Sequence, residues 1–381
     1  VPPGVVQLLP GQGETVGAQL TSDERVRGVM FTGSTEVATL LQRNIATRLD
    51  AQGRPIPLIA ETGGMNAMIV DSSALTEQVV VDVLASAFDS AGQRCSALRV
   101  LCLQDDVADH TLKMLRGAMA ECRMGNPGRL TTDIGPVIDE EAKANIERHI
   151  QAMRAKGRPV FQAVRENSDD AREWQTGTFI APTLIELESF DELQKEVFGP
   201  VLHVVRYTRN NLGSLIEQIN ASGYGLTLGV HTRIDETIAQ VTGSAQVGNL
   251  YVNRNMVGAV VGVQPFGGEG LSGTGPKAGG PLYLYRLLAN RPESALAVTL
   301  ARQDAELKAA LTQPLNALRE WAANRPELQA LCTQYGELAQ AGTQRLLPGP
   351  TGERNTWTLL PRERVLCIAD DEQDALTQLA A

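Results

Sequence analysis

The stretch VRGVMFTGSTEVATLLQRNIATRL, residues 26–49, decides the class of fold. It opens with VRGVMFTG, an apolar run that is typical of a short buried strand ending at a glycine. The residues after the glycine predict a helix, because their apolar members recur at helical spacing: Val37, Leu40, Leu41, Ile45 and Leu49. Ser34 or Thr35 can cap this helix, and Glu36 falls in its first turn. A strand, a glycine turn and a helix make half of a βαβ unit.

The same alternation continues outward from this stretch. IPLIAETGG, residues 56–64, and AMIVDSSA, residues 67–74, are predicted strands. Residues 75–92 predict a helix that ends at Gly92, and ALRVLCL, residues 97–103, predicts the next strand. Strand and helix patterns alternate to about residue 255. The fold class that this predicts is α/β, with a largely parallel sheet.

The composition excludes several classes of protein. Apolar residues make up 43% of the 381 residues and charged residues 20%, as in globular proteins. A net charge of −10 without a basic block argues against a nucleic-acid-binding surface, and no apolar run is long enough to span a membrane. Five cysteines without a C-x-x-C pair or a zinc-like cluster predict reduced thiols in the cytoplasm and no metal site.

The two ends of the chain and its last quarter indicate that the sequence is part of a longer protein. The chain begins VPPGVVQLLPG, without an initiator methionine or a signal peptide, and we expect it to be a fragment cut at both ends. From about Arg291 the composition shifts to helices rich in Ala, Leu, Glu and Gln. LLPGQGE, residues 8–14, is echoed by LLPGPTGE, residues 346–353, which is either chance or the start of a degenerate second copy.

Cys95 is the first candidate for chemistry, because it follows GQR on the loop between a predicted helix and a predicted strand. Arg94 adds a positive charge that is expected to favour the thiolate. The alternative is that Cys95 is a loop thiol without a function, and the local sequence supports the two interpretations equally. Cys102 lies inside the apolar run VLCL and is predicted to be an inert core residue. The remaining cysteines are also predicted to be structural: Cys122, Cys332 and Cys367.

Two carboxylates are the other candidates, since none of the four histidines carries a signature that would favour a Cys/His hydrolase. Glu61 follows the apolar run LIA at a strand end, where burial would raise its pKa and suit it to act as a general base. The alternative for Glu61 is a solvated turn residue. In KEVFGP, Glu196 and Phe198 lie on one side of an extended segment. A carboxylate there can accept hydrogen bonds from ribose hydroxyls.

Taken together, FTGST, ETGG, GQRC, EVFGP and PFGG occur in an order and at separations that resemble the aldehyde dehydrogenase superfamily. The resemblance covers about residues 1–290 and includes the offset of 34 residues between Glu61 and Cys95. It implies four regions. They are the C-terminal half of a Rossmann-like NAD-binding domain (1–63), a catalytic α/β domain (64–270), a return segment for oligomer contacts (271–290) and the start of a non-catalytic C-terminal domain (291–381).

The resemblance also implies a role for each motif residue. Cys95 would attack the aldehyde carbon to give a thiohemiacetal and then a thioester, with its own N–H as half of an oxyanion hole. Glu61 would activate the water that hydrolyses the thioester. The cofactor NAD would meet four residues: Gly33 and Ser34 at its pyrophosphate, Glu196 at the nicotinamide ribose and Phe198 beside the nicotinamide.

Residues 258–281 narrow the resemblance to the glutamate-γ-semialdehyde (pyrroline-5-carboxylate) dehydrogenases, whose substrate is L-glutamate γ-semialdehyde. In these enzymes an anchor loop binds the substrate's α-carboxylate, which implies that role here for Ser96, Gly258 and Ala259. A plain surface turn is the alternative for this loop. The tail, residues 291–381, resembles the C-terminal region of the long bacterial proline utilization A enzymes. Their FAD-dependent proline dehydrogenase, and any DNA-binding or membrane-associated part, have no counterpart in this sequence.

The sequence departs from the family in its missing upstream part. The oxyanion asparagine and the lysine that contacts the adenine ribose lie before the equivalent of Val1. We therefore expect the isolated chain to be inactive. The resemblance also implies that the parent protein is a cytoplasmic homo-oligomer, at most peripheral at the inner face of the plasma membrane.

Two other hypotheses stay open. One is a Cys95-dependent hydrolase or acyl-transfer enzyme that works without NAD, and the other is a non-catalytic structural or interaction fragment.

Overall fold

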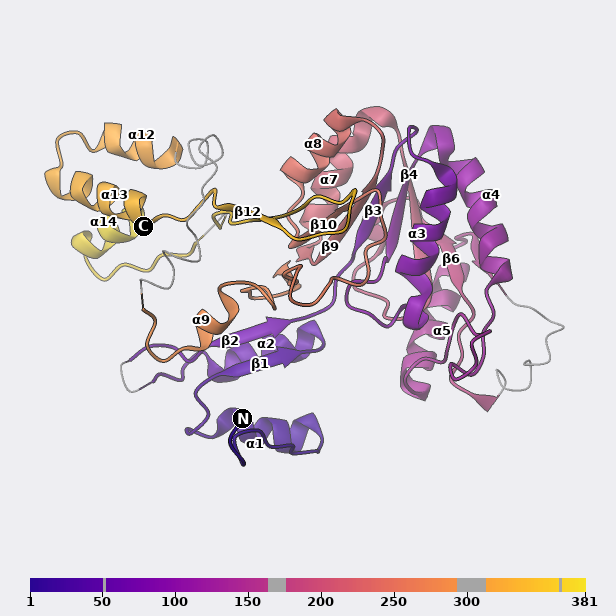
Figure 1. Ribbon diagram of the computed structural model, residues 1–381, viewed down its shortest axis with the longest axis horizontal. Coiled ribbons are helices and arrows are strands. Elements are labelled where there is room, and N and C mark those ends of the chain that lie inside the picture. Colours follow the sequence, from indigo (N-terminus) through magenta and orange to yellow (C-terminus); the bar gives the residue numbers. More distant parts are fainter. Residues whose placement is uncertain (51–52, 164–175, 293–312, 363–364) are drawn as a thin grey trace. The chain divides into compact units, whose positions relative to one another are not determined.

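The fold is described from a computed structural model, shown in Figure 1. The structure describes residues 1–50, 53–163, 176–292, 313–362 and 365–381. The chain divides into two compact units. The first, which we call the sheet unit, comprises Val1–Ala259 and Phe266–Ala278. The second, the C-terminal unit, comprises Val260–Pro265 and Gly279–Ala381.

The strand–turn–helix that was predicted at residues 26–49 is confirmed. Strand β1 (Val29–Thr32) leads into helix α2 (Thr35–Ile45), and strand β2 (Leu58–Glu61) pairs parallel with β1, with Thr32 opposite Glu61. Of the two candidate caps, Ser34 is the one used, because its Oγ accepts a hydrogen bond from the N–H of Val37. A π-helical turn (Gly13–Gly17) and helix α1 (Ala18–Ser22) precede this unit.

The main sheet has the strand order β10-β9-β3-β4-β7-β6-β5, and every neighbouring pair is parallel except β5 with β6. Its strands are β3 (Ala67–Val70), β4 (Val100–Gln104), β5 (Val160–Gln162), β6 (Thr183–Glu186), β7 (Val201–Tyr207), β9 (Thr227–His231) and β10 (Asn249–Val252). Three adjacent strands, β9, β3 and β4, are buried along their whole length. The largely parallel α/β sheet that the sequence predicts is therefore confirmed.

Helices cover both faces of this sheet. Figure 1 shows α3 and α4 on one side and α7 and α8 on the other, as right-handed crossovers that run in opposite directions along the sheet require. The helices are α3 (Thr76–Phe88), α4 (Asp105–Glu121), α5 (Glu140–Ala155), α7 (Leu212–Ala221) and α8 (Asp235–Ser244). Short 3₁₀ turns lie at Asp89–Gly92, Phe190–Glu192 and Arg209–Asn211, and β8 (Tyr224–Gly225) pairs antiparallel with β11 (Glu269–Gly270).

The predicted end of helix α3 at Gly92 is wrong. The helix ends at Phe88, and the chain then passes through three consecutive residues with positive φ: Ser90 (56°), Ala91 (54°) and Gly92 (66°). Such values are costly for residues with a Cβ, so tertiary contacts must hold the turn. One contact is clear, since a Cβ on Gly92 would lie 2.2 Å from the carbonyl oxygen of Gly199. The turn therefore brings the segment before Cys95 against the EVFGP segment.

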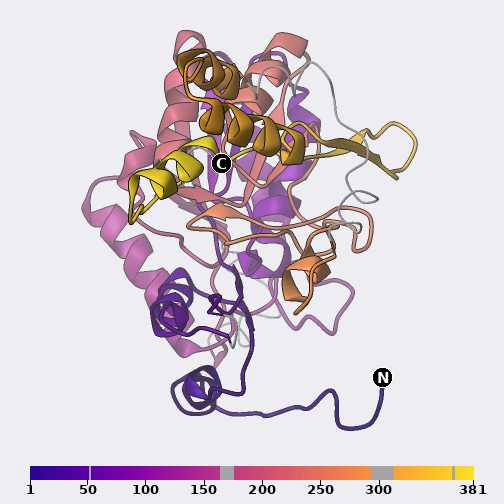
Figure 2. The ribbon, with the colours of Figure 1, turned by 90° about the vertical axis from the view of Figure 1, so that its left-hand side faces the viewer.

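The C-terminal unit contains the helices that its composition predicts. Helices α12 (Gln313–Trp321), α13 (Pro326–Leu338) and α14 (Glu372–Ala380) share a small core, and α9 (Tyr283–Leu287) precedes them. Figure 2 shows the three helices gathered together and an antiparallel hairpin, β12 (Gln344–Leu347) with β13 (Asn355–Thr358), extending from them. LLPGPTGE lies at the tip of this hairpin, whereas LLPGQGE has no strand, so the two echoed segments differ in local structure.

Candidate active site

A buried asparagine holds the loop that carries Cys95 through hydrogen bonds to its backbone. Asn66, only 2% exposed, donates from Nδ2 to the carbonyl oxygens of Cys95 (2.7 Å) and Ala97 (2.9 Å). Its Oδ1 accepts a hydrogen bond from the N–H of Thr227 on β9 (3.1 Å). A single side chain thus ties the Cys95 loop to the neighbouring strand. The sequence analysis missed Asn66, although a polar residue at the start of the apolar run AMIV was a signal.

The Cys95 thiol is half-buried, and its surroundings oppose ionisation. Burial raises its pKa, and the carboxylates of Glu196 and Glu61 raise it further, while the N–H groups of Ser96 and of Cys95 itself act in the opposite direction. Arg94, which was expected to favour the thiolate, donates from its Nε to Ser90 Oγ (3.0 Å), and the net effect of the surroundings on Cys95 is a raised pKa. The surroundings of the folded chain therefore favour the thiol over the thiolate.

Glu61 ends strand β2 with its carboxylate enclosed by the PFGG segment. Its Oε2 accepts a hydrogen bond from the N–H of Gly268 (2.9 Å), and its Oε1 is buried without a hydrogen-bond partner among the described residues. A Cβ on Gly267 or Gly273 would lie about 3 Å from this carboxylate, so both positions are built for its close approach. Burial raises the pKa of Glu61 to about 7, although Lys277 partly opposes the rise. The interpretation of Glu61 as a solvated turn residue is therefore wrong.

Arg99 joins the Cys95 loop to the EVFGP segment, and the sequence analysis missed it. This side chain is fully buried, with Nε and Nη2 donating to Glu196 Oε1 (3.0 and 2.8 Å). The guanidinium also donates to the carbonyl oxygens of Gly92 (2.7 Å) and Arg94 (3.0 Å). Its carbon lies 5.1 Å from the centre of the Phe198 ring. A charged residue inside the apolar run ALRVLCL was the available signal.

Glu196 and Phe198 lie where these contacts place them. The N–H of Gly64 lies near the carboxylate of Glu196 and favours its charged form, and a Cβ on Gly63 would overlap its Oε2. Gly63 is thus required by Glu196, whereas a Cβ on Gly64 would lie 2.3 Å from the Oδ1 of Asn66. Burial raises the pKa of Glu196, and Arg99 opposes the rise. Phe198 keeps 46% of its surface exposed and can receive a planar group.

The predicted pyrophosphate turn lies near these carboxylates. The N–H of Gly33 donates to the carbonyl oxygen of Glu61 (3.1 Å), and both Gly33 and Ser34 are exposed. Burial raises the pKa of Tyr224, the nearby side chain of Thr35, the first residue of α2, opposes the rise, and the charge of Glu196 adds to it. The N-terminus of α2 therefore opens toward the side of the site that holds Glu196.

The three predicted substrate residues are not joined to one another by any hydrogen bond among the described residues. Ser96 is buried, and its N–H lies against the Cys95 sulfur. Gly258 is exposed with a φ of +78°, and Ala259 is half-buried beside it. The start of their loop is fixed, because the N–H of Met256 donates to Ser86 Oγ (3.0 Å).

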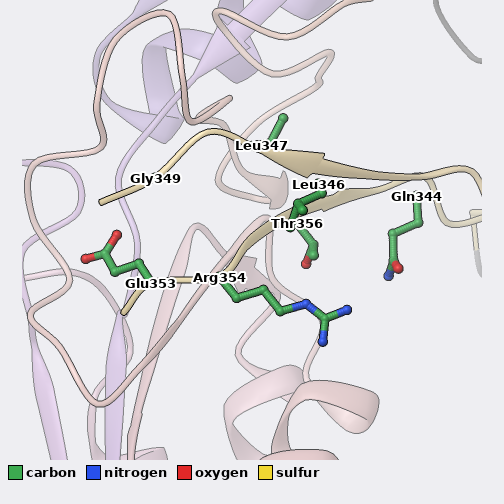
Figure 3. A pocket seen from close by; sticks show the side chains of 7 residues that line it. All are labelled: Gln344, Leu346, Leu347, Gly349, Glu353, Arg354 and Thr356. Carbon is green, nitrogen blue, oxygen red and sulfur yellow. The ribbon is translucent and has the colours of Figure 1, made fainter. Parts of the chain in front are cut away.

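Other kinds of site are not found in the part of the chain that the structure describes. It has no group of three or more His, Cys, Asp or Glu residues that could hold a metal, and no helix long and apolar enough to cross a membrane. A hollow in the C-terminal unit follows the β12–β13 hairpin, as Figure 3 shows. None of the predicted site residues lines it; those that do are Gln344, Leu346, Leu347, Gly349, Glu353, Arg354 and Thr356.

Comparison with known proteins agrees with this geometry. The sequence profile of the aldehyde dehydrogenase family matches residues 1–289. The chain belongs to the aldehyde dehydrogenase family. The family assignment and the α/β fold expected from the motifs are thus confirmed, and the five motifs that carried the resemblance all lie within the matched residues.

Several similar proteins have names that state an activity. The chain is 93% identical to the bifunctional protein PutA of Escherichia coli (strain K12), over all of this chain and 29% of that protein. The crystal structure of a bifunctional proline utilization A protein matches 75% of this chain and 28% of its own, with 52% identity and a TM-score of 0.69. A 1-pyrroline-5-carboxylate dehydrogenase from Thermus with bound NAD matches 75% of this chain and 54% of its own, with 36% identity and a TM-score of 0.68. The chain thus spans under a third of its PutA relatives.

Proposed function

We propose that the protein containing this chain oxidises L-glutamate γ-semialdehyde to L-glutamate with NAD, the second step of proline catabolism. The observation that carries the proposal is Glu61, a half-buried carboxylate whose Oε1 is fully buried, with a pKa raised to about 7 and a charge that acts on Cys95. A carboxylate poised near neutral pH beside a thiol suits an acyl transfer followed by hydrolysis. The PutA and 1-pyrroline-5-carboxylate dehydrogenase relatives support the choice of substrate.

In this proposal Cys95 gives its proton to solvent water, and its Sγ then attacks the aldehyde carbon, which gives a thiohemiacetal. The N–H of Cys95 donates to the oxygen that gains negative charge. NAD, when bound, accepts the hydride that leaves this carbon, and a thioester remains on Cys95. Glu61 takes a proton from water, the water oxygen attacks the thioester carbon, and the thiol leaves as L-glutamate forms. About half of the Glu61 carboxylates are ionised at pH 7, so the base is available there.

The chain's residues fit part of an NAD molecule. Gly33 and Ser34 are exposed at the N-terminus of the eleven-residue helix α2, where backbone N–H groups favour a pyrophosphate. Glu196 is the acceptor for the hydroxyls of the nicotinamide ribose, and the exposed ring of Phe198 packs beside the nicotinamide. FAD is assigned to the proline dehydrogenase part of the longer relatives and has no role in these residues.

The substrate's α-carboxylate is assigned to Ser96, Gly258 and Ala259. The positive φ of Gly258 and the room around it support this assignment, because backbone N–H groups on such a loop can turn toward an anion. We keep the four regions 1–63, 64–270, 271–290 and 291–381 as the proposed domains, with a cytoplasmic homo-oligomer as the proposed assembly. Peripheral association of the parent with the plasma membrane stays a prediction.

The test is NADH formation from L-glutamate γ-semialdehyde by the protein as its own cells make it. Cys95→Ala is expected to abolish turnover, whereas Cys367→Ala, which changes an exposed cysteine, is expected to leave it unchanged. Turnover that survives Cys95→Ala contradicts the proposal, and so does Cys95-dependent ester hydrolysis with no oxidation of the aldehyde. The same assay on the 381-residue chain tests the expectation that it is inactive alone.

A further inference from the structure

We infer that Arg99 is a positioning residue that ties the loop of Cys95 to the Glu196–Phe198 segment, and so governs NAD binding and the reactivity of the nucleophile together. The part that concerns NAD rests on the function proposed above, whereas the part that concerns Cys95 does not. Arg99 lies four residues after Cys95 in sequence, but its main partner, Glu196, is 97 residues away. Arg99 is therefore close to Cys95 along the chain and in direct contact with Glu196 of the EVFGP motif.

The contacts of Arg99 account for all of its donors. Nε and Nη2 both donate to Glu196 Oε1, and Nη2 donates also to the carbonyl oxygen of Arg94. Nη1 donates to the carbonyl oxygen of Gly92 and, at 3.4 Å, to that of Gly199. A lysine has a compact ammonium in place of this planar fork and cannot reach acceptors on both segments at once. The guanidinium thus fixes the turn before Cys95 and the EVFGP segment in one arrangement.

The same contacts leave Glu196 able to bind a ribose. A carboxylate has about four acceptor positions. Arg99 occupies two of them on Oε1, so acceptor positions stay open for a hydroxyl among the contacts of the described residues. Because Arg99 also lies against one face of the Phe198 ring, it sets the orientation of both groups that are assigned to the nicotinamide ribose end of NAD.

Arg99 also balances charge around the nucleophile. The charged groups that act on the Cys95 sulfur are the carboxylates of Glu196 and Glu61, which oppose the thiolate, and the guanidinium of Arg99, which favours it. A variant that removes only the guanidinium leaves the charge of Glu196 buried without its partner, which destabilises the folded state. A variant that removes both charges avoids this cost. Comparing the two variants therefore separates the electrostatic role of Arg99 from its role in packing.

The experiment compares four proteins in their full native length: wild type, Arg99→Lys, Arg99→Met and the double variant Arg99→Met/Glu196→Gln. Arg116→Met is the matched control, because Arg116 also pairs with a glutamate, Glu186, and lies 5.9 Å from a phenylalanine ring, but on helix α4. Three quantities are measured: the KM for NAD and kcat, the rate at which iodoacetamide alkylates Cys95 at a fixed pH near 8 without NAD, and the thermal midpoint.

We expect Arg99→Lys to raise the KM for NAD about tenfold, since it loses charge-assisted hydrogen bonds to Glu196 and its neighbours. Arg99→Met is expected to slow alkylation of Cys95 about tenfold as well, because the thiolate loses its cation and gains an unbalanced carboxylate. The double variant should recover the thermal midpoint and the alkylation rate together, because both buried charges are gone. A purely structural role predicts instead that Arg99→Met lowers the midpoint while it leaves the alkylation rate of Cys95 at the wild-type value.

Two results would overturn the inference. One is an Arg99→Lys protein whose KM for NAD equals that of Arg116→Met. The other is an Arg99→Met protein that alkylates as fast as wild type. If the wild type itself fails to oxidise the aldehyde with NAD, the proposed function fails, yet the alkylation rates still decide the role of Arg99 at Cys95. The two failures are therefore distinguishable.

Discussion

Replacing Glu61 by glutamine is expected to stabilise the folded chain above pH 7 while it removes the proposed base. Glutamine has nearly the same shape, and its side-chain oxygen can still accept the hydrogen bond that Gly268 donates to Glu61. It carries no charge, so it avoids the cost of ionising a carboxylate whose Oε1 is buried and has no partner in the part of the chain that the structure describes. Glu61 thus lowers the stability of the folded chain at neutral and higher pH, while its carboxylate is the proposed base.

The magnitude follows from the pKa of Glu61, which rises from 4.5 to about 7 on folding. A carboxylate with a raised pKa favours the folded state when protonated, so its stabilising effect is full below pH 4.5 and is lost as the pH rises through 7. The shift corresponds to about 3 kcal/mol in total, of which about 2.5 kcal/mol falls between pH 5 and pH 8. Glu61→Gln removes this pH-dependent loss.

The assay is guanidinium unfolding of the 381-residue chain, followed by far-ultraviolet circular dichroism at pH 5 and pH 8. The free energy of unfolding of Glu61→Gln, relative to wild type, should increase by about 2.5 kcal/mol between the two pH values. Glu147→Gln, at an exposed position of helix α5, is the control and should show almost no difference, because the substitution changes no buried charge. Equal pH dependence in wild type and Glu61→Gln would refute the burial argument.

The remaining predictions concern turnover, labelling and local stability. Hydrolysis of the thioester should rise with pH and level off above a midpoint near 7, where Glu61 ionises, as a pH profile of single-turnover product release would show. At pH 8 iodoacetamide should modify Cys95 but spare Cys102, whose burial raises its pKa to about 12, and peptide mass spectrometry reports both sites. Asn66→Ala should lower the free energy of unfolding by about 2 kcal/mol, because it leaves buried backbone groups unpaired, and slow turnover with it. Ser34→Ala should cost about 1 kcal/mol through the lost cap of α2, measured by denaturant unfolding.

The parts of the fold that follow from short-range pattern were predictable. The spacing of apolar residues after Gly33 placed α2, and the N-cap could be reduced to two neighbouring residues before the structure selected Ser34. The raised pKa of Glu61 was also predictable, since a carboxylate that follows an apolar strand end is buried by whatever packs there. In each case the deciding interaction lies within a few residues or depends on burial alone.

The parts that depend on distant contacts were not predictable. Arg94 is next to Cys95 in sequence, but its side chain binds Ser90, and the cation that acts on the thiol is Arg99. The role of Arg99 depends on a partner 97 residues away, which no local pattern indicates. Helix α3 ends before Gly92 for a similar reason, because the positive φ values of the turn depend on packing against the EVFGP segment.

The measurement that tests the central claim most directly is the mass of the Cys95 peptide after a single turnover. Glu61→Gln, in the protein as its own cells make it, is mixed with L-glutamate γ-semialdehyde and NAD and quenched in acid. The account predicts a γ-glutamyl thioester on Cys95 that accumulates only when NAD is present, because the acyl group forms by oxidation and cannot be hydrolysed without the base. An unmodified Cys95, or the same adduct formed without NAD, would contradict it.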